Sequence, residues 1–178
     1  MMNHPLPHPN TYWVTPGRLL AGEYPGAWSE REARDRLRRY LDVGITYFLD
    51  LTDEADGLEP YAPLLHVEAE ARGIAVAHKR MTIHDMNTPT ITLMTDILNT
   101  LDNALADGHT VYVHCWGGIG RTGTVVGCHL ARHGRTGEQA LKHLAQLWRG
   151  VAKSRTYPRS PQTDEQVEFV WKWNEATG

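Results

Sequence analysis

The stretch VYVHCWGGIGRTGTVVGCHLARHG, residues 111–134, joins an apolar strand pattern to a helical pattern through a glycine-rich turn. The strand is predicted at Thr110–Cys115, a short run of apolar, β-branched and aromatic residues. After the turn, the pattern from Arg121 to Gly134 is helical and closes on a glycine. Cys115 therefore stands at the carboxyl end of a buried strand, directly before a helix.

Strand patterns and helical patterns alternate on both sides of this stretch. We predict strands within residues 17–25, 45–51, 74–81 and 110–115, the first of them at an edge of the sheet, and helices within residues 29–44, 61–73, 91–108, 121–134, 136–150 and 160–178. Such alternation is typical of an α/β domain with a mostly parallel central sheet flanked by helices. Sites in these domains lie beyond the carboxyl ends of the strands.

The length and composition indicate one domain and exclude several kinds of partner. The chain has 178 residues, which fits a proline-rich, flexible arm over residues 1–12 and a single domain over residues 13–178. Eighteen basic and 21 acidic side chains leave no electrostatic footprint for nucleic acid. No apolar run reaches the roughly 18 residues of a membrane helix, and the start lacks the apolar region of a secretory signal. We expect a cytoplasmic protein with no membrane insertion.

The segment CWGGIGR places Cys115 and Arg121 six positions apart, with Gly117, Gly118 and Gly120 between them. Glycine permits positive φ, so such a loop can fold until successive amide N–H groups converge and bind an anion. The helix expected from Arg121 directs its partly positive N-terminus at the same point. Arg121 adds a planar fork of donors that matches two phosphate oxygens. The loop therefore indicates an oxyanion site.

The same positive field acts on the Cys115 thiol. Convergent amides, a helix N-terminus and a guanidinium favour the thiolate, and such settings lower the pKa of a cysteine to roughly 3.5–7.5. We therefore expect Cys115 to be a nucleophile in covalent phosphoryl transfer, with Thr122 hydrogen-bonding the sulfur as it leaves. A purely structural thiol would explain neither Arg121 nor the glycines. For Cys128, within the following helix, a packed core thiol is the simpler interpretation.

The remaining loop residues are the candidates for contact with substrate: Trp116, Gly117, Gly118, Ile119 and Gly120. The ring of Trp116 could form a wall at the mouth of the site or pack in the core, and the sequence leaves both open. The ten histidines are scattered and pair with neither cysteine, so we expect no metal site and no cofactor.

Covalent phosphoryl transfer also requires a general acid and a positioned water. Asp85, in the proline-bearing loop IHDMNTPT, is the first choice for the acid, and Asp53 and Glu54 are the second choices. Gln162 and Gln166 are candidates for positioning water, and they would share one face if the last helix began before them. A solvated helix start explains the two glutamines equally well.

These residues resemble the cysteine-dependent protein tyrosine phosphatase superfamily. Its signature H-C-x5-R-S/T is present as HCWGGIGRT, residues 114–122, and HDMNTP is similar to the acid loop of the compact dual-specificity branch, such as cyclin-dependent-kinase-associated phosphatases and bacterial relatives. The likeness extends from about Gly17 to Val170. It implies a phosphatase-like fold with Cys115 as nucleophile, Arg121 as phosphate clamp and Asp85 as mobile acid.

The resemblance also implies roles for three further residues. His114 would hold the cysteine loop, and QTDEQ is similar to the glutamine loop that positions water, which implies that role for Gln162 and extends to Gln166. Two features depart from the family pattern: His84 precedes Asp85 where tryptophan or proline is common, and no tyrosine-bearing loop deepens the site. The preference between phosphotyrosine and phosphoserine or phosphothreonine therefore stays open.

The leading interpretation is a protein phosphatase that acts on phosphotyrosine, and on phosphoserine or phosphothreonine as well, in phosphorylated proteins or peptides. A first alternative is a phosphatase for inositol phosphates or phosphoinositides, although relatives of that kind carry lysines within the cysteine loop and CWGGIGR has none. A second alternative is an inactive phosphate-binding module. The presence of Cys115, Arg121 and Asp85 together argues against it.

Overall fold

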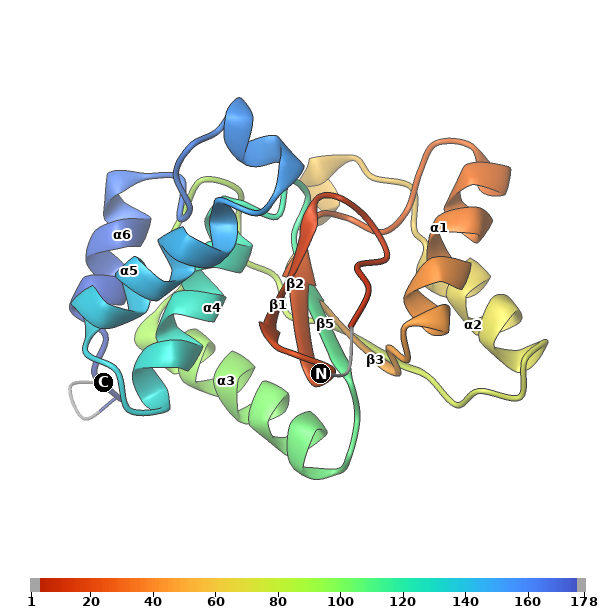
Figure 1. The fold of residues 1–178 in the computed structure, drawn as a ribbon, viewed down its shortest axis with the longest axis horizontal. Coiled ribbons are helices and arrows are strands. Elements are labelled where there is room, and N and C mark those ends of the chain that lie inside the picture. Colours follow the sequence, from red (N-terminus) through yellow and green to blue (C-terminus); the bar gives the residue numbers. More distant parts are fainter. Residues whose placement is uncertain (1–3, 176–178) are drawn as a thin grey trace.

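The computed structural model describes residues 4–175, which form one five-stranded sheet with helices on both faces (Figure 1). The strands are β1 Thr11–Thr15, β2 Leu19–Gly22, β3 Tyr47–Asp50, β4 Ala77–Arg80 and β5 Val111–His114. Their order across the sheet is β1-β2-β5-β3-β4. Only β1 and β2 pair antiparallel, and the other three pairs are parallel. The predicted α/β domain with a mostly parallel sheet is confirmed.

Six α-helices and two short 3-10 helices complete the described residues. Their bounds are α1 Glu30–Asp42, η1 Glu54–Asp56, α2 Ala62–Glu70, α3 Ile91–Ala106, α4 Gly120–Arg132, α5 Gly137–Trp148, η2 Ala152–Arg155 and α6 Asp164–Trp171. Each predicted helical stretch overlaps one of the six α-helices. Residues 176–178 of the last predicted stretch lie outside the described residues. Among the described residues, no helix combines the length and apolar character that crossing a membrane requires.

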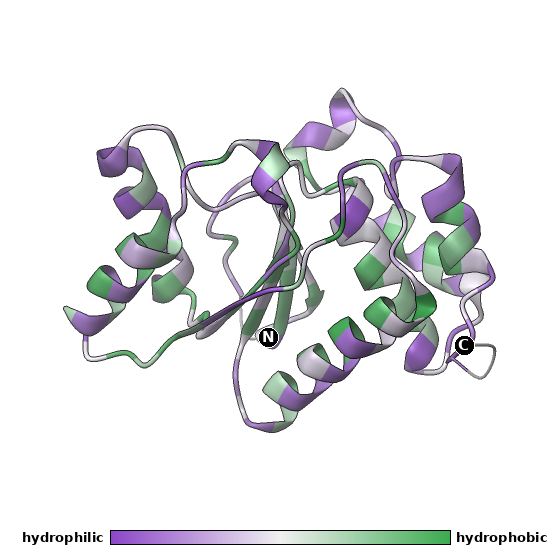
Figure 2. Cartoon of the chain, turned by 180° about the vertical axis from the view of Figure 1, so that it is seen from behind, coloured by the Kyte–Doolittle hydropathy of each residue, from purple (hydrophilic) through white to green (hydrophobic). Residues whose placement is uncertain are grey.

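The sheet separates two apolar cores of unequal size. In β2, Leu19 and Ala21 face the larger core beneath α3, α4, α5 and α6, while Leu20 faces the smaller core beneath α1 and α2. This division follows from the period of two residues by which a strand turns its side chains to opposite faces. Figure 2 shows the matching pattern on the helices, whose hydrophobic residues turn toward the sheet and whose hydrophilic residues turn outward.

The prediction for the start of the domain needs correction. Residues 17–25 contain a strand, but β2 is internal, because β1 pairs with it antiparallel and takes the edge. Thr11 is fully buried and Tyr12 belongs to the larger core, so two residues that the sequence assigned to the arm are part of the sheet. Residues 1–3, also assigned to the arm, lie outside the described residues.

The central position of β5 decides where the cysteine lies. Val111–His114 pairs in parallel with β2 on one side and β3 on the other, and all four residues are buried. The carboxyl ends of three neighbouring parallel strands therefore meet at one edge of the sheet. Cys115 follows β5 at that edge, between the strand and α4.

Helix α3 offers a test of the larger core. Leu101 is fully buried there, whereas Val67 on α2 is half exposed. We expect Leu101→Ala to lower the free energy of unfolding by about 2–5 kcal/mol, because the substitution removes buried methyl groups and leaves a cavity. Val67→Ala should change it by less than about 0.5 kcal/mol. Urea denaturation of both variants checks this, and equal losses would contradict the assignment of Leu101 to the core.

Candidate active site

The loop between β5 and α4 folds tightly around the sulfur of Cys115. The thiol is buried, and the amide of Gly118 donates to Sγ at 3.3 Å. Gly118 has a φ of 73°, and a Cβ at this position would lie 2.4 Å from the carbonyl carbon of Gly22 in β2. Backbone cannot move aside as a flexible side chain can, so this position requires glycine. The predicted start of the helix near Arg121 is confirmed, since α4 begins at Gly120.

Carbonyl groups of the loop are bound from outside by three separate segments. The carbonyls of residues 116, 117 and 119 accept, in that order, from the amide of Tyr24 at 2.9 Å, the ammonium of Lys153 at 3.1 Å and the hydroxyl of Ser160 at 2.7 Å. These contacts hold the carbonyls outward, while the amide of Gly118 donates to the sulfur. This is the arrangement of an anion-binding nest.

Arg121 lies beside the loop, with its guanidinium almost fully buried. Nη1 donates to Asp56 Oδ2 at 2.7 Å and to the carbonyl of Ile83 at 3.2 Å, while Nη2 lies 3.3 Å from Asp56 Oδ1 and 3.1 Å from Asp85 Oδ1. Burial alone would lower the pKa of Arg121, but the bond to Asp56 and the neighbouring negative charges raise it, so the guanidinium stays charged.

Two polar atoms in the first turn of α4 are left without partners. Nε of Arg121 and Oγ1 of Thr122 are both buried, and neither has a hydrogen-bond partner among the described residues. Buried donors are rarely left unpaired in native proteins, and such exceptions are common at binding sites. An oxyanion above Cys115 would give the arginine donor a partner.

Asp56 is the acidic residue that the sequence analysis missed. It is the last residue of η1, the short helix that follows β3. Asp53 caps this helix, and its amide donates to Asp56 Oδ2 at 2.9 Å. Its carboxylate is nearly inaccessible to solvent. The D-x-x-D spacing of Asp53 and Asp56 is the sequence signal for the reciprocal cap, but nothing in the sequence pairs Asp56 with Arg121.

The three acid candidates lie in different settings. Asp85 is half exposed, lines the pocket described below and contacts Arg121. Asp53 caps η1 and also forms an ion pair with His84, the residue before Asp85. Glu54 is exposed at the start of η1. The geometry thus brings only Asp85, of these three, to both the pocket and the arginine.

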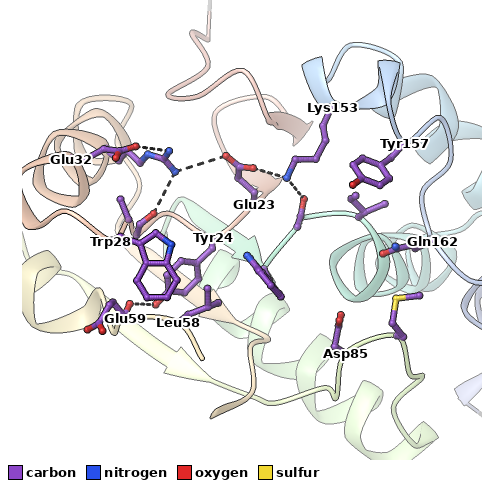
Figure 3. A pocket seen from close by; sticks show the side chains of 17 residues that line it. Glu23, Tyr24, Trp28, Glu32, Leu58, Glu59, Asp85, Lys153, Tyr157 and Gln162 are labelled. Atoms are coloured by element: carbon purple, nitrogen blue, oxygen red, sulfur yellow. Dashed lines mark hydrogen bonds and ion pairs between the residues drawn. The ribbon is translucent and has the colours of Figure 1, made fainter. Parts of the chain in front are cut away.

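A pocket of about 570 Å³ opens over the loop (Figure 3). Trp116, Gly117 and Ile119 from the loop line it, together with Asp85 and, from the segment before α6, Gln162. The Trp116 side chain is half exposed, so it stands at the mouth of the pocket and not in the core. Gly118 and Gly120 are buried beneath. Figure 3 shows Lys153 and Glu23 in contact on the side of the pocket opposite Asp85.

His114 holds the loop from below and does not reach the pocket surface. It is fully buried, and its Nδ1 lies 3.2 Å from the carbonyl oxygen of Cys115. A carbonyl can only accept, so Nδ1 carries the proton and Nε2 accepts from the hydroxyl of Tyr61 at 2.6 Å. Burial lowers the pKa of His114, although the charge of Asp50 and the bond to Cys115 oppose the shift. The ring is therefore neutral in one defined tautomer.

The two glutamines do not share a helix face, because α6 begins at Asp164 and Gln162 precedes its cap, Thr163. Gln162 lines the pocket. Gln166 is fully buried: its Oε1 accepts from the amides of Gln162 and Thr163, each at 3.1 Å, and its Nε2 donates to the carbonyl of Asn87 at 3.1 Å. Its amide group thus fastens α6 to the Asp85 loop.

Comparison with known proteins agrees with this geometry. The family model described as "PTP-SAK: Swiss Army Knife protein, DSP-PTPase phosphatase domain" matches residues 8–170. The tyrosine-protein phosphatase cdc-14 of Caenorhabditis elegans is 24% identical over 168 residues, which are 93% of this chain and 22% of the relative. The chain thus spans about a quarter of the length of the curated relatives it matches.

Solved structures share the fold. Kinase associated phosphatase (KAP), with its catalytic-site cysteine replaced by serine, has a TM-score of 0.70 and 18% identity, with 90% of each chain covered. PTPMT1 in complex with PI(5)P has a TM-score of 0.66 and 19% identity, with 92% of this chain and 93% of that chain covered. At these identities the likeness concerns the fold alone.

The contact between Asp56 and Arg121 can be tested without a substrate. We expect Asp56→Asn to lower the free energy of unfolding by about 3 kcal/mol, because it removes one partner of a buried ion pair. Inorganic phosphate should restore part of this loss, since the anion supplies a new partner for the guanidinium. Glu54→Gln, two residues away on the exposed side of η1, is the control. Thermal melting with and without phosphate measures both effects. An unchanged stability in Asp56→Asn would contradict the contribution of the Asp56–Arg121 ion pair to the fold.

The buried neutral His114 predicts a dependence of stability on pH. Its folded pKa lies below the unfolded value of about 6.5, so its contribution is complete above pH 6.5 and is lost as the pH falls through the folded pKa. Wild-type unfolding free energy should therefore decline between pH 7 and pH 5. The slope of unfolding free energy against pH should be smaller in His114→Gln. Burial also lowers the pKa values of His8 and His129, and these two residues should produce the remaining slope. An unchanged slope in His114→Gln would show that His114 does not contribute to the pH dependence of stability.

Proposed function

The chain belongs to the DSP-PTPase phosphatase family, and from that membership and the geometry of the cysteine loop we propose that it hydrolyses phosphate monoesters through a cysteinyl-phosphate. The observation that carries the proposal is the buried Cys115 sulfur, which accepts from the Gly118 amide, together with the neighbouring Arg121, whose buried Nε has no hydrogen-bond partner among the described residues. A bound phosphoryl group would satisfy the arginine donor. It would also meet the amides of the loop.

The proposed reaction has two steps. Cys115 Sγ attacks phosphorus, the bond from phosphorus to the ester oxygen breaks, and Asp85 donates a proton to the leaving oxygen. Water then attacks the cysteinyl-phosphate and releases inorganic phosphate and the thiolate. Asp85, now a carboxylate, accepts the proton of that water, and Gln162 at the pocket wall positions the water molecule. Thr122 donates to the sulfur as it leaves.

Arg121 stabilises the charge that gathers on the three phosphoryl oxygens. Its Nη groups are held by Asp56 and Ile83, so the guanidinium has a fixed orientation and Nε is left as a donor without a partner. Such preorganisation lowers the cost of reorganising the site during the reaction. His114 acts on the loop through the carbonyl of Cys115 and is a positioning residue.

For the substrate we propose phosphotyrosine, and also phosphoserine or phosphothreonine, in proteins or peptides. The pocket is open and includes the half-exposed ring of Trp116, which suits an aromatic or extended substrate. An inositol phosphate is the second candidate, favoured by the presence of Lys153 at the pocket wall. Glu23 lies 2.6 Å from that ammonium and neutralises it, so the protein substrate is preferred. Two free cysteines suit a reducing compartment, and we place the protein in the cytoplasm.

A substrate panel tests this proposal. The wild-type protein should release phosphate from phosphotyrosine and phosphothreonine peptides at least tenfold more efficiently, in kcat/KM, than from inositol phosphates. Cys115→Ser should abolish turnover on every substrate, because a hydroxyl is a far weaker nucleophile than a thiolate, while keeping measurable phosphate binding. Activity retained in Cys115→Ser would refute the covalent route. A higher kcat/KM for inositol phosphates would instead support the second candidate, an inositol phosphate substrate.

Asp85 can be tested through the leaving group. Loss of a general acid costs most when the leaving group is basic, on the order of 10²-fold for phosphotyrosine or phosphothreonine, and less for an activated aryl phosphate. Asp85→Asn should show this graded loss in kcat. Asp53→Asn and Glu54→Gln are the matched controls. Each should lower kcat by the same factor for both substrates or leave it unchanged. A graded loss at either control, with a uniform loss at Asp85, would transfer the role of acid.

A further inference from the structure

Helix α3 packs against α4 (Figure 1). Away from the pocket, two histidines and one aspartate of these helices meet. His129 and His133 lie four residues apart at the C-terminal end of α4, so they share one face of that helix. Asp102 comes from α3. The expectation of no metal site treated the histidines as scattered and overlooked the H-x-x-x-H spacing of His129 and His133.

The spacing of the three ligand atoms fits a metal ion. Asp102 Oδ1 lies 3.0 Å from His133 Nε2 and 3.6 Å from His129 Nδ1, and one ligand atom from each residue falls within 4.8 Å of the other two. Tetrahedral zinc bound at about 2.0–2.1 Å holds its ligand atoms about 3.3 Å apart. Only small side-chain movements separate the present arrangement from that geometry.

The strongest single sign of a missing partner is on His129. Its side chain is 9% exposed, and Nδ1 is buried without a hydrogen-bond partner among the described residues. A buried polar nitrogen left unpaired destabilises the folded state. His133 Nε2 already contacts Asp102 Oδ1. The same carboxylate oxygen therefore faces both histidine rings.

The surroundings orient the carboxylate. Arg132 Nη1 donates to Asp102 Oδ2 at 3.0 Å, which fixes the carboxylate and leaves Oδ1 directed at the histidines. Metal-binding residues are commonly held in this way by a second polar partner. Arg132 is itself paired with Glu175, which offsets its charge. The C-terminal end of α4 adds the partly negative end of the helix dipole.

We propose that Asp102, His129 and His133 bind a divalent transition-metal ion and that this ion fastens α3 to α4. Two imidazoles and one carboxylate match zinc best, with solvent at the fourth position because His133 is half exposed. His129 follows Arg121 by eight residues, about 12 Å along a helix axis. The ion therefore takes no part in phosphate chemistry, and this proposal does not depend on the proposed function.

Metal binding is best measured in Cys115→Ser protein without a histidine tag, because a cysteine sulfur is itself a zinc ligand. Titration with Co²⁺, followed by the visible absorption of the bound ion, and calorimetric titration with Zn²⁺ should both give one site per chain. The melting temperature should rise with Zn²⁺. Adding His133→Ala, at a half-exposed position that folding tolerates, should weaken binding at least tenfold and remove the rise.

His66→Ala is the matched control, because His66 is exposed on α2, on the other side of the sheet, and it should leave binding unchanged. Circular dichroism at neutral pH confirms that each variant is folded. The proposal is overturned if the Cys115→Ser protein binds no stoichiometric metal, if binding survives His133→Ala, or if His66→Ala weakens it equally. A chelator should leave wild-type phosphate release intact, which separates this site from the cysteine loop.

Discussion

The buried contact between the guanidinium of Arg121 and the carboxylate of Asp56 is the interaction on which the arrangement of the site depends. It joins α4 to the segment that follows β3, and the same arginine reaches the carbonyl of Ile83 in the segment that follows β4. An unpaired charge at this depth would be strongly destabilising. Three segments that are distant in sequence are therefore held at one edge of the sheet by one side chain.

The sequence predicts the centre of this arrangement because the decisive residues are contiguous. The strand before Cys115, the glycines and the helix after Arg121 all lie within residues 110–134, and local patterns suffice to place them. Gly118 shows the limit of such reasoning. Its positive φ was expected, but its close approach to the backbone of Gly22 depends on the pairing of β5 with β2, which no local pattern describes.

Residues that act through distant contacts were the ones missed or misplaced. Asp56 meets an arginine 65 positions later, and β1 becomes the edge of the sheet only because β2 lies next to β5. The glutamines were spaced for a common helix face, yet the reciprocal cap between Thr163 and Gln166 starts α6 after Gln162. Gln166 donates to the Asn87 carbonyl and packs against Gly120, so it links the Asp85 loop to the cysteine loop.

The placement of the two cysteines has a consequence for oxidation. Cys128 is fully buried within α4 and lies seven residues, about 11 Å of helix, beyond Arg121. A disulfide needs Cα atoms within about 7 Å, so Cys128 cannot reach Cys115 while α4 is intact. Burial also raises the pKa of Cys128, which keeps it an unreactive thiol. A sulfenic acid formed on Cys115 would therefore find no resolving thiol at Cys128, and a disulfide between the two cysteines is excluded while the fold is intact.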